Sequence, residues 1–244
     1  MATFKGIDVS KWQGAIDWNK VKAAGIDFAI IRAGYGKEIS QKDAYFEANY
    51  KGAKAAGIPV GCYWYSYAKS VAEAKREAAV CMEAIKGKQF EYPVYFDIED
   101  NSQVSLGKTT LTDICNAFCK EIENAGYFVG VYANTNWFQN YLDHKALSGK
   151  YTIWLADYRT LYNITLKRDI HQYSSKGRVD GINGNVDMNK CTRDFPTIIK
   201  NAGLNGFQKV SVVLKDITIK QASPGDINDF AQLAKNKELE YVIS

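Results

Sequence analysis

The sequence predicts an α/β fold: an irregular (β/α) barrel made of five β/α units and short closing strands, followed by a small C-terminal β-α-β appendage. The main observation is a repeated pattern, in which a segment with helical periodicity ends in small residues and a glycine, and an apolar strand follows. The pattern recurs at spacings of roughly 30 to 40 residues, which is typical of successive β/α units. A second observation is the length, because 244 residues suffice for one such barrel and an appendage.

Glycines end the expected helices in the first half of the chain, because glycine accepts the left-handed backbone that stops a helix. Each of these glycines stands shortly before an apolar run, and the pairs are Gly25 before 28–32, Gly57 before 60–65, Gly87 before 94–98 and Gly126 before 128–132. With a first strand that ends near Asp8, these runs predict five parallel strands. The expected helices cover residues 16–24, 43–56, 71–86 and 109–125.

The second half of the barrel has a different pattern. A short helical stretch at 136–147 precedes apolar runs at 151–156 and 169–173, and these runs are too close together for a helical crossover of normal length. A turn-rich stretch at 177–184 then leads into a last short strand at 185–188. We expect these short strands, some of them antiparallel, to close the barrel wall.

The domain organisation follows from where this pattern stops. We expect the barrel within residues 1–196, a linker rich in Asn and Gly at 197–206, and a small C-terminal module at 207–244. A segment shorter than about 40 residues cannot bury a stable core alone. The module must therefore pack on the barrel, pair with a second copy, or belong to a larger unit.

The C-terminal module has the pattern of one β-α-β unit. Residues 210–220 and 240–243 are the expected strands, and Ser223 and Pro224 begin the helix, since Ser is a favoured N-cap and Pro suits the first helical position. An apolar stripe follows at helical spacing, made of Ile227, Phe230, Ala231 and Ala234. This stripe is surface that one such unit cannot cover by itself.

Composition excludes several classes of function. The chain has 31 Lys and Arg against 27 Asp and Glu, a net charge of +4, and no dense basic run, so no nucleic-acid partner is expected. No apolar stretch approaches the roughly 18 residues of a membrane span. The first residues lack the pattern of a signal peptide, and five cysteines without framework spacing suit a reducing compartment. We therefore expect synthesis in the cytoplasm and no membrane association.

The run 94–98 ends in a pair of carboxylates. Side chains two residues apart in a strand point to the same face, so Asp97 and Glu99 share one wall with their Cα atoms about 6–7 Å apart. Like charges this close, in an aromatic setting, separate their proton affinities, so that one carboxyl stays protonated while the other is anionic. This arrangement suits a glycosidase, although the pair alone also fits the polar end of a strand that enters a loop.

Other polar and aromatic residues stand at the ends of the expected strands, where barrels of this kind place their sites. Together with Asp97 and Glu99 they are Asp8, Tyr63, Tyr65, Tyr132, Trp154, Asp157, Tyr173 and Asp187. Taken singly, Asp8 also fits a turn cap, Asp187 an Asn/Asp turn, and Trp154 and Tyr173 the core. The set contains no metal-ligand pattern, and we expect neither a metal nor another cofactor.

Five motifs make the sequence recognisable when they are taken in order. They are Gly6-Ile-Asp-Val-Ser-Lys-Trp-Gln-Gly14, Phe96-Asp-Ile-Glu99, Tyr151-Thr-Ile-Trp-Leu-Ala-Asp157, His171-Gln-Tyr173 and Val186-Asp-Met-Asn189. The chain resembles glycoside hydrolase family 25, the lysozymes that cleave peptidoglycan, over about residues 3–196. One departure is Tyr63-Trp-Tyr65, where many family members have Tyr-His-Phe.

The resemblance implies a modified β/α barrel that hydrolyses the β-1,4 bond from N-acetylmuramic acid to N-acetylglucosamine. It implies that Glu99 is the general acid, that Asp97 is its neighbour, and that Asp8 and Asp187 are the other acidic residues of the site. The tyrosines, Trp154 and Asp157 are the expected substrate contacts. Two alternatives stay open: a wall-binding lectin that has lost its chemistry, and a glycosidase for a related N-acetylated polymer such as chitin.

Mechanism and setting are further expectations. No second carboxylate is evident as a nucleophile, so we expect the N-acetyl group of the substrate to attack, with Asp97 orienting it and the configuration retained. The enzyme is expected to reach the cell wall after release by another protein. The C-terminal module is expected to bind the wall or to self-associate.

Overall fold

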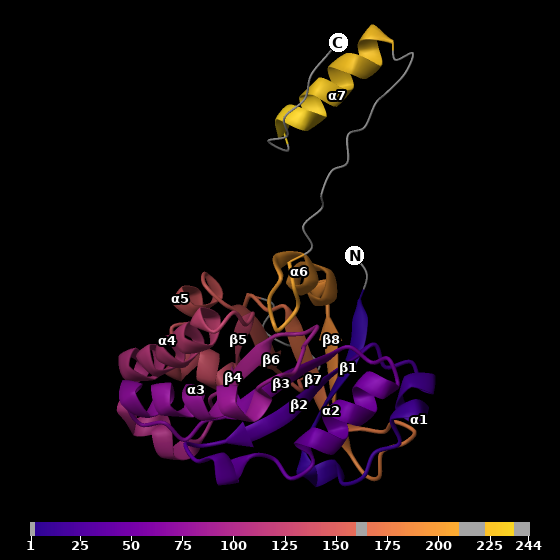
Figure 1. Ribbon diagram of the computed structural model, residues 1–244. Coiled ribbons are helices and arrows are strands. Elements are labelled where there is room, and N and C mark those ends of the chain that lie inside the picture. Colours follow the sequence, from indigo (N-terminus) through magenta and orange to yellow (C-terminus); the bar gives the residue numbers. More distant parts are fainter. Residues whose placement is uncertain (1–2, 160–164, 210–222, 237–244) are drawn as a thin grey trace. The chain divides into compact units, whose positions relative to one another are not determined.

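The computed structural model describes residues 3–159, 165–209 and 223–236. The chain divides into two compact units, Met1–Val210 and Ser211–Ser244. The first unit is a barrel with helices around it (Figure 1). In the second unit the described element is helix α7 (Pro224–Asn236).

Eight strands form a closed barrel in sequence order. They are β1 (Phe4–Val9), β2 (Phe28–Tyr35), β3 (Val60–Tyr65), β4 (Val94–Asp97), β5 (Val129–Asn134), β6 (Thr152–Ala156), β7 (Ile170–Gly177) and β8 (Val186–Cys191). Strands β1 to β7 run parallel to one another, and β8 is antiparallel to both β7 and β1. The predicted irregular α/β barrel is confirmed, and the change of direction falls at β8 alone.

Helices cover the sides and one end of the barrel (Figure 1). They are α1 (Trp18–Ala23), α2 (Phe46–Ala55), α3 (Val71–Ile85), α4 (Lys108–Asn124), α5 (His144–Ser148) and α6 (Phe195–Ala202), with short turns at Lys11–Gln13, Ile39–Gln41, Asn101–Leu106 and Trp137–Tyr141. Side chains cap the N-termini of four of these helices; for example, Asp17 accepts from Lys20 N and Ser70 accepts from Glu73 N. None of the helices among the described residues is long and apolar enough to cross a membrane.

Aromatic side chains fill the amino-terminal half of the barrel interior. Phe28 stacks on Tyr92 with ring centroids 4.4 Å apart, and Phe195 of α6 packs on Tyr92 from the end of the barrel. Two strand glycines make room for these rings: a Cβ on Gly6 would lie 2.2 Å from the ring of Phe28, and one on Gly130 would lie 2.4 Å from that of Tyr95. Because this half is filled and covered, polar groups have access to solvent at the opposite, carboxyl-terminal end.

The region 197–206, expected as a linker, belongs to the barrel unit in the structure. It contains most of α6, and Ile199 is buried with the interior aromatics. Asn205 is fully buried, donates to the carbonyls of Phe90 and Tyr92 at 2.9 Å each, and accepts from Phe128 N at 2.6 Å. Composition suggested a linker because Asn and Gly are turn residues, but here they terminate a packed helix and tie it to the segments that precede β4 and β5.

The C-terminal helix begins where the sequence predicts. Ser223 Oγ accepts from Asp226 N at 3.2 Å, and α7 starts at Pro224. Along α7 the stripe of Ile227, Phe230, Ala231 and Ala234 is the less exposed side. The two strands expected at 210–220 and 240–243 lie outside the described residues.

Candidate active site

Four carboxylates gather at the end of the barrel where the parallel strands β1 to β7 end and the antiparallel strand β8 begins. Asp8 on β1 pairs in register with Asp187 on β8, so these two acids lie directly opposite each other on adjacent antiparallel strands. Asp97 is the last residue of β4, and Glu99 follows two residues later. Alternation along each strand turns all four side chains toward the barrel interior. Asp8 and Asp97 are buried, whereas Glu99 and Asp187 are half-buried and open to solvent.

Asp8 is held by a network of amides and aromatic donors. Its Oδ2 accepts from Gln172 Nε2 at 2.8 Å and from Asn189 Nδ2 at 2.7 Å. The amide oxygens are fixed in turn, since Tyr132 donates to Gln172 at 3.0 Å and Trp154 donates to Asn189 at 2.8 Å. Burial, and next the charge of Asp187, raise the pKa of Asp8, while the two amide donors act in the opposite direction.

Of the two buried acids, Asp97 has less hydrogen bonding than Asp8 to compensate for its ionised form. Its Oδ1 is buried without a hydrogen-bond partner among the described residues. Burial raises the pKa of Asp97 well above its usual range, and the charges of Glu99 and Asp8 add to this effect. The charge of Arg32 opposes it, and Arg32 itself pairs with Asp43 at 2.7 Å. A buried carboxyl with these neighbours favours its protonated form.

Glu99 faces an open cavity. Its Oε2 accepts from Asn134 Nδ2 at 3.0 Å, which leaves the other oxygen for a ligand. Burial raises the pKa of Glu99, although the bond from Asn134 lowers it. The cavity measures about 660 Å³, and besides Glu99 it is lined by Tyr132, Asn134, Thr135, Asn136, Gln139, Ala156, Asp157, Tyr158 and Arg159. A carboxyl that holds a proton at the wall of such a cavity can act as a general acid.

Asp187 completes the group, and burial raises its pKa as well. The four acids therefore share one region of space and differ in exposure and in hydrogen bonding. Such differences separate their proton affinities, so that a proton donor and carboxylate anions coexist in one site. This is the equipment that acid-catalysed cleavage of a glycosidic bond requires.

Four of the predicted aromatic contacts lie inside the barrel below or beside the acids. Trp154 is buried at the centre of this group, with Tyr63 edge-on at 6.0 Å, Tyr95 at 5.2 Å and Tyr132 tilted at 4.5 Å. Tyr65 stands at the end of β3 and donates to Asp100 Oδ2 at 3.2 Å. Trp154 and Tyr132 support the carboxylate network from beneath, whereas Tyr63 and Tyr65 are half-buried at the edge of the site.

The remaining two predicted contacts are placed differently. The Asp157 side chain is bound by Arg159, whose Nε and Nη2 donate at 2.9 Å and 2.6 Å, and by Thr135 at 3.0 Å. These bonds, led by those from Arg159, hold the pKa of Asp157 well below its usual range. Tyr173 lies on the outer face of β7, because its neighbour Gln172 points inward, and Lys190 Nζ lies 4.9 Å from its ring. The structure does not bring Tyr173 together with the four acids.

The sequence profile of glycosyl hydrolases family 25 matches residues 7–182. The chain belongs to glycosyl hydrolases family 25. The predicted family and the predicted class of enzyme, a glycoside hydrolase, are thereby confirmed.

Three similar proteins illustrate the relationship. The autolytic lysozyme of Clostridium acetobutylicum is 28% identical over 221 residues, which cover 88% of this chain and 65% of that protein. The solved lysozyme from Streptomyces coelicolor is 28% identical with a TM-score of 0.71, covering 83% of this chain and 98% of that one. The modular autolysin LytC from Streptococcus pneumoniae, solved in complex with a synthetic peptidoglycan ligand, is 30% identical with a TM-score of 0.68, covering 77% of this chain and 46% of that one.

Sequence reasoning missed the amides and the exposed tyrosine of this family 25 site. Gln172 and Asn189 stand inside two of the motifs, yet their contacts to Asp8 join positions 164 and 181 residues apart. Asn134 lies two residues after Tyr132 on the same inward face of its strand. This alternation is the sequence signal that could have identified Asn134. Tyr158 donates to Gln172 at 2.6 Å, and its position in a loop gave no periodic signal.

The burial of Asp97 gives a prediction about stability. In the unfolded chain this carboxyl loses its proton near the ordinary value of 3.8, whereas burial raises its pKa in the folded barrel. The contribution of the group to folding is therefore fully present below 3.8 and is lost as the pH rises toward the folded pKa. We expect Asp97→Asn to increase stability at pH 7, by about 0.5–2 kcal/mol, and expect this gain to shrink as the pH is lowered toward 3.8.

The measurement is the midpoint of thermal unfolding from pH 4 to pH 8. Asp113→Asn, an exposed change of the same kind on α4, serves as the control and should leave the midpoint unchanged. A lower midpoint for Asp97→Asn at pH 7 would show that the carboxylate is stabilised in the folded state.

Proposed function

We propose that this family 25 enzyme is a muramidase that hydrolyses the β-1,4 bond between N-acetylmuramic acid and N-acetylglucosamine in bacterial peptidoglycan. The observation that carries the proposal is the half-buried Glu99 at the wall of an open cavity, with three further acids behind it. The naming of two relatives as lysozymes and the peptidoglycan ligand of LytC support the choice of substrate.

Proton donation by Glu99 is the first step of the proposed reaction. Its Oε2 is occupied by the Asn134 amide, so the proton is carried by Oε1 on the side that faces the cavity. Transfer to the glycosidic oxygen breaks the bond to the leaving sugar and leaves positive charge on the sugar ring that remains. The anionic members of the acid cluster lie beneath this ring and stabilise that charge.

The substrate itself supplies the nucleophile in this proposal. Asp97 is buried and lies deeper than Glu99, a position from which it contacts an N-acetyl group that reaches into the site. Asp97 orients that group and accepts a hydrogen bond from its N–H as the acetyl oxygen attacks the anomeric carbon. A water molecule then attacks the anomeric carbon and displaces the acetyl oxygen, while Glu99 removes a proton from that water. Two successive displacements at the anomeric carbon retain its configuration.

The role of Glu99 is tested by Glu99→Gln. Glutamine keeps the size of the side chain and its bond to Asn134 but has no acidic proton, so hydrolysis should fall by about 10²- to 10⁴-fold while the fold is kept. Turbidity clearing of purified walls measures the rate, and analysis of the new reducing ends identifies the bond that is cleaved. The matched control is Glu83→Gln on the exposed face of α3, which should clear walls at the wild-type rate.

The assignment fails if Glu99→Gln retains near-wild-type turnover with an unchanged circular dichroism spectrum. Walls that bind the wild type but gain no reducing ends would indicate a lectin instead. New ends on N-acetylglucosamine alone, or faster cleavage of chitin, would indicate a glycosidase of different specificity.

Stereochemistry tests the proposed mechanism. Substrate-assisted cleavage predicts that the anomer released first has the β configuration of the substrate bond. Proton NMR of a soluble wall fragment, recorded within the first minutes of cleavage, distinguishes the two anomers before they equilibrate. Initial release of the α anomer would exclude the mechanism, whereas a trapped glycosyl-aspartate at Asp97 would keep retention and give Asp97 the role of nucleophile.

We also propose that the C-terminal unit raises the local concentration of enzyme at the wall, by self-association or by wall binding. Support comes from α7, whose stripe of Ile227, Phe230, Ala231 and Ala234 is apolar and less exposed than the opposite side.

Truncation after Val210, the end of the barrel unit, tests this proposal. Cleavage of small soluble fragments should be unchanged, because the acid cluster lies wholly within the barrel. Wall clearing should slow. If the unit self-associates, light scattering should report a fall in particle mass that is larger than the mass of the removed residues. Equal wall clearing, equal wall binding and the monomer mass before and after truncation would refute the proposed role.

A further inference from the structure

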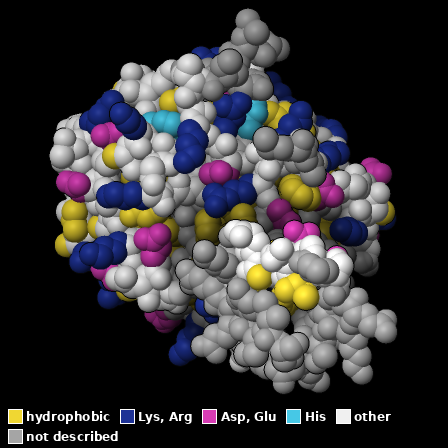
Figure 2. Space-filling model, turned by 90° about the horizontal axis from the view of Figure 1, so that it is seen from above, with side chains coloured by type: hydrophobic (Ala, Val, Ile, Leu, Met, Phe, Trp, Pro, Cys, Tyr) yellow, Lys and Arg dark blue, Asp and Glu magenta, His cyan; other side chains and the backbone are white. Residues whose placement is uncertain are grey.

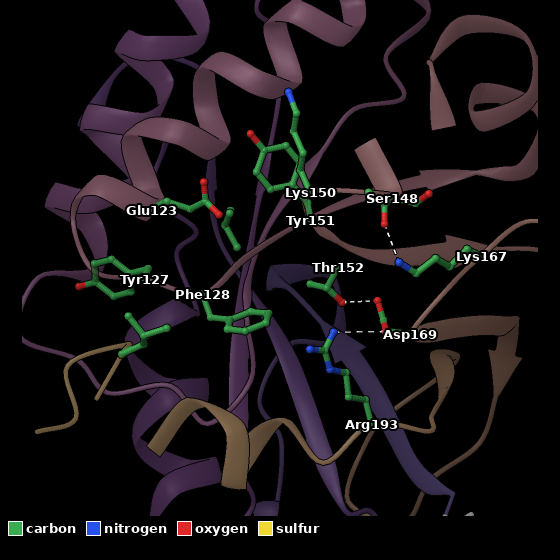
Figure 3. A pocket seen from close by; sticks show the side chains of 13 residues that line it. Glu123, Tyr127, Phe128, Ser148, Lys150, Tyr151, Thr152, Lys167, Asp169 and Arg193 are labelled. Atoms are coloured by element: carbon green, nitrogen blue, oxygen red, sulfur yellow. Dashed lines mark hydrogen bonds and ion pairs between the residues drawn. The ribbon is translucent and has the colours of Figure 1, made fainter. Parts of the chain in front are cut away.

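A second cavity lies at the end of the barrel opposite the four acids. It measures about 500 Å³ and is lined by the first residues of β5 and β6, Val129 and Thr152, together with the loops that precede them. The end of α4 contributes Glu123, and Arg193 follows β8. Figure 3 shows these side chains arranged around the hollow, with Tyr127 and Phe128 on one side and Lys167 on the other. Neither the acid cluster nor the open cavity at Glu99 shares a residue with it.

Aromatic rings form much of the cavity wall. Tyr127 and Phe128 are half-buried and Tyr151 is buried, and all three line the hollow (Figure 3). The guanidinium of Arg193 lies over the ring of Phe128 at 5.6 Å. Among the described residues no hydrogen bond is made by the hydroxyl of Tyr127 or of Tyr151. Flat apolar faces with uncommitted hydroxyls beside them are suited to sugar rings, which present C–H faces and hydroxyl edges.

The charged groups of the cavity leave cationic donors available. Lys150 is exposed, and its ammonium group makes no ion pair or hydrogen bond with the described residues. Lys167 donates one bond, to the Ser148 carbonyl at 2.6 Å. Asp169 is already engaged, because it accepts from Thr152 Oγ1 at 2.7 Å and from Ile153 N at 3.1 Å. Its contact with Arg193 is 3.5 Å long, so the remaining guanidinium donors stay open to a ligand.

An adjoining cavity of about 440 Å³ extends the positive surface. It shares Lys167 and Asp169 with the first and adds Arg168 and Lys190. The two linings together carry five cations, Lys150, Lys167, Arg168, Lys190 and Arg193, against two carboxylates, Glu123 and Asp169. Figure 2 views the barrel from the end that α6 covers, and Lys and Arg side chains are numerous on this face. The charge therefore favours an anionic ligand.

We propose that this second cavity is a binding site for an anionic wall glycan, with the sugar against Tyr127, Phe128 and Tyr151 and the anionic group at Lys150, Lys167 and Arg193. The anion is either a carboxylate of a peptide-bearing glycan or a phosphate of a polyol-phosphate polymer attached to the wall. The choice of a wall polymer rests on the proposed function; the cavity, its rings and its charge do not.

The location of this site determines what it does. The strands are four to eight residues long, so the two ends of the barrel are separated by roughly 20 Å. A glycan in the second cavity is therefore a different segment from the one at Glu99. Binding there holds the enzyme on the wall between cleavage events and raises the effective concentration of substrate at the acid cluster.

The test is wall binding by variants that cannot cleave. Glu99→Gln/Lys150→Glu is compared with Glu99→Gln/Lys51→Glu, where Lys51 is an exposed lysine of α2 without an ion pair among the described residues. Both carry the same change in net charge. Cosedimentation with purified walls at low salt gives the dissociation constants. We expect Lys150→Glu to weaken binding by about fivefold relative to the control, which corresponds to roughly 1 kcal/mol, and Lys150→Arg to bind as tightly as the control.

Two further measurements separate the possible outcomes. Walls stripped of phosphate polymers distinguish the two anions. If the variants bind stripped walls equally, the ligand is the phosphate; if their dissociation constants still differ, the ligand is the carboxylate. Lys150→Glu alone should cleave small soluble fragments at the wild-type rate. Equal dissociation constants for the two double variants on intact walls and on stripped walls would overturn the proposal. So would a failure of the double variant with Lys51→Glu to bind walls. Cleavage of soluble fragments by the wild type tests the proposed function independently of these results.

Discussion

The burial of like charges at one end of the barrel is the constraint on which the rest of this structure depends. Asp8 and Asp187 face each other across adjacent strands, an arrangement that destabilises a sheet unless other groups compensate. Here two amides donate to Asp8, and another donates to Glu99. Removing these carboxylates from water raises the pKa of each of the four acids. This electrostatic cost is local to the site. It keeps these carboxyls protonated at a pH at which exposed carboxyls have lost their protons.

The fold supports this site from beneath. Aromatic rings fill the amino-terminal half of the interior, and α6 closes that end with Phe195 and Ile199. Trp154 belongs to both layers, because its ring packs on Tyr95 while its indole N–H fixes Asn189. The packed core thereby sets the position of the amide that holds Asp8. A rigid floor of this kind preorganises the charges, so they need not rearrange when the transition state forms.

The elements that the sequence predicted well are those with local signals. The glycines that end helices located β4, and the period of two along that strand placed Asp97 and Glu99 on one wall. The amide network was out of reach, because its bonds connect residues that are distant in sequence. Tyr173 shows a second limit: its motif position suggested a contact, but the face of the strand on which it lies decides where its side chain points. The linker at 197–206 failed as an expectation because Asn205, in composition a turn residue, acts as a buried connector.

The central claim is that the four acids hold protons differently from exposed carboxyls. The most direct measurement is carbon-13 NMR of the side-chain carboxyls in labelled protein between pH 3 and pH 9, with each resonance assigned by its loss in a single Asp→Asn or Glu→Gln variant. The account predicts that the resonances of Asp8, Asp97, Glu99 and Asp187 titrate above the ordinary values of 3.8 and 4.5, with Asp97 among the last to lose its proton. Titration of all four at those ordinary values would contradict it.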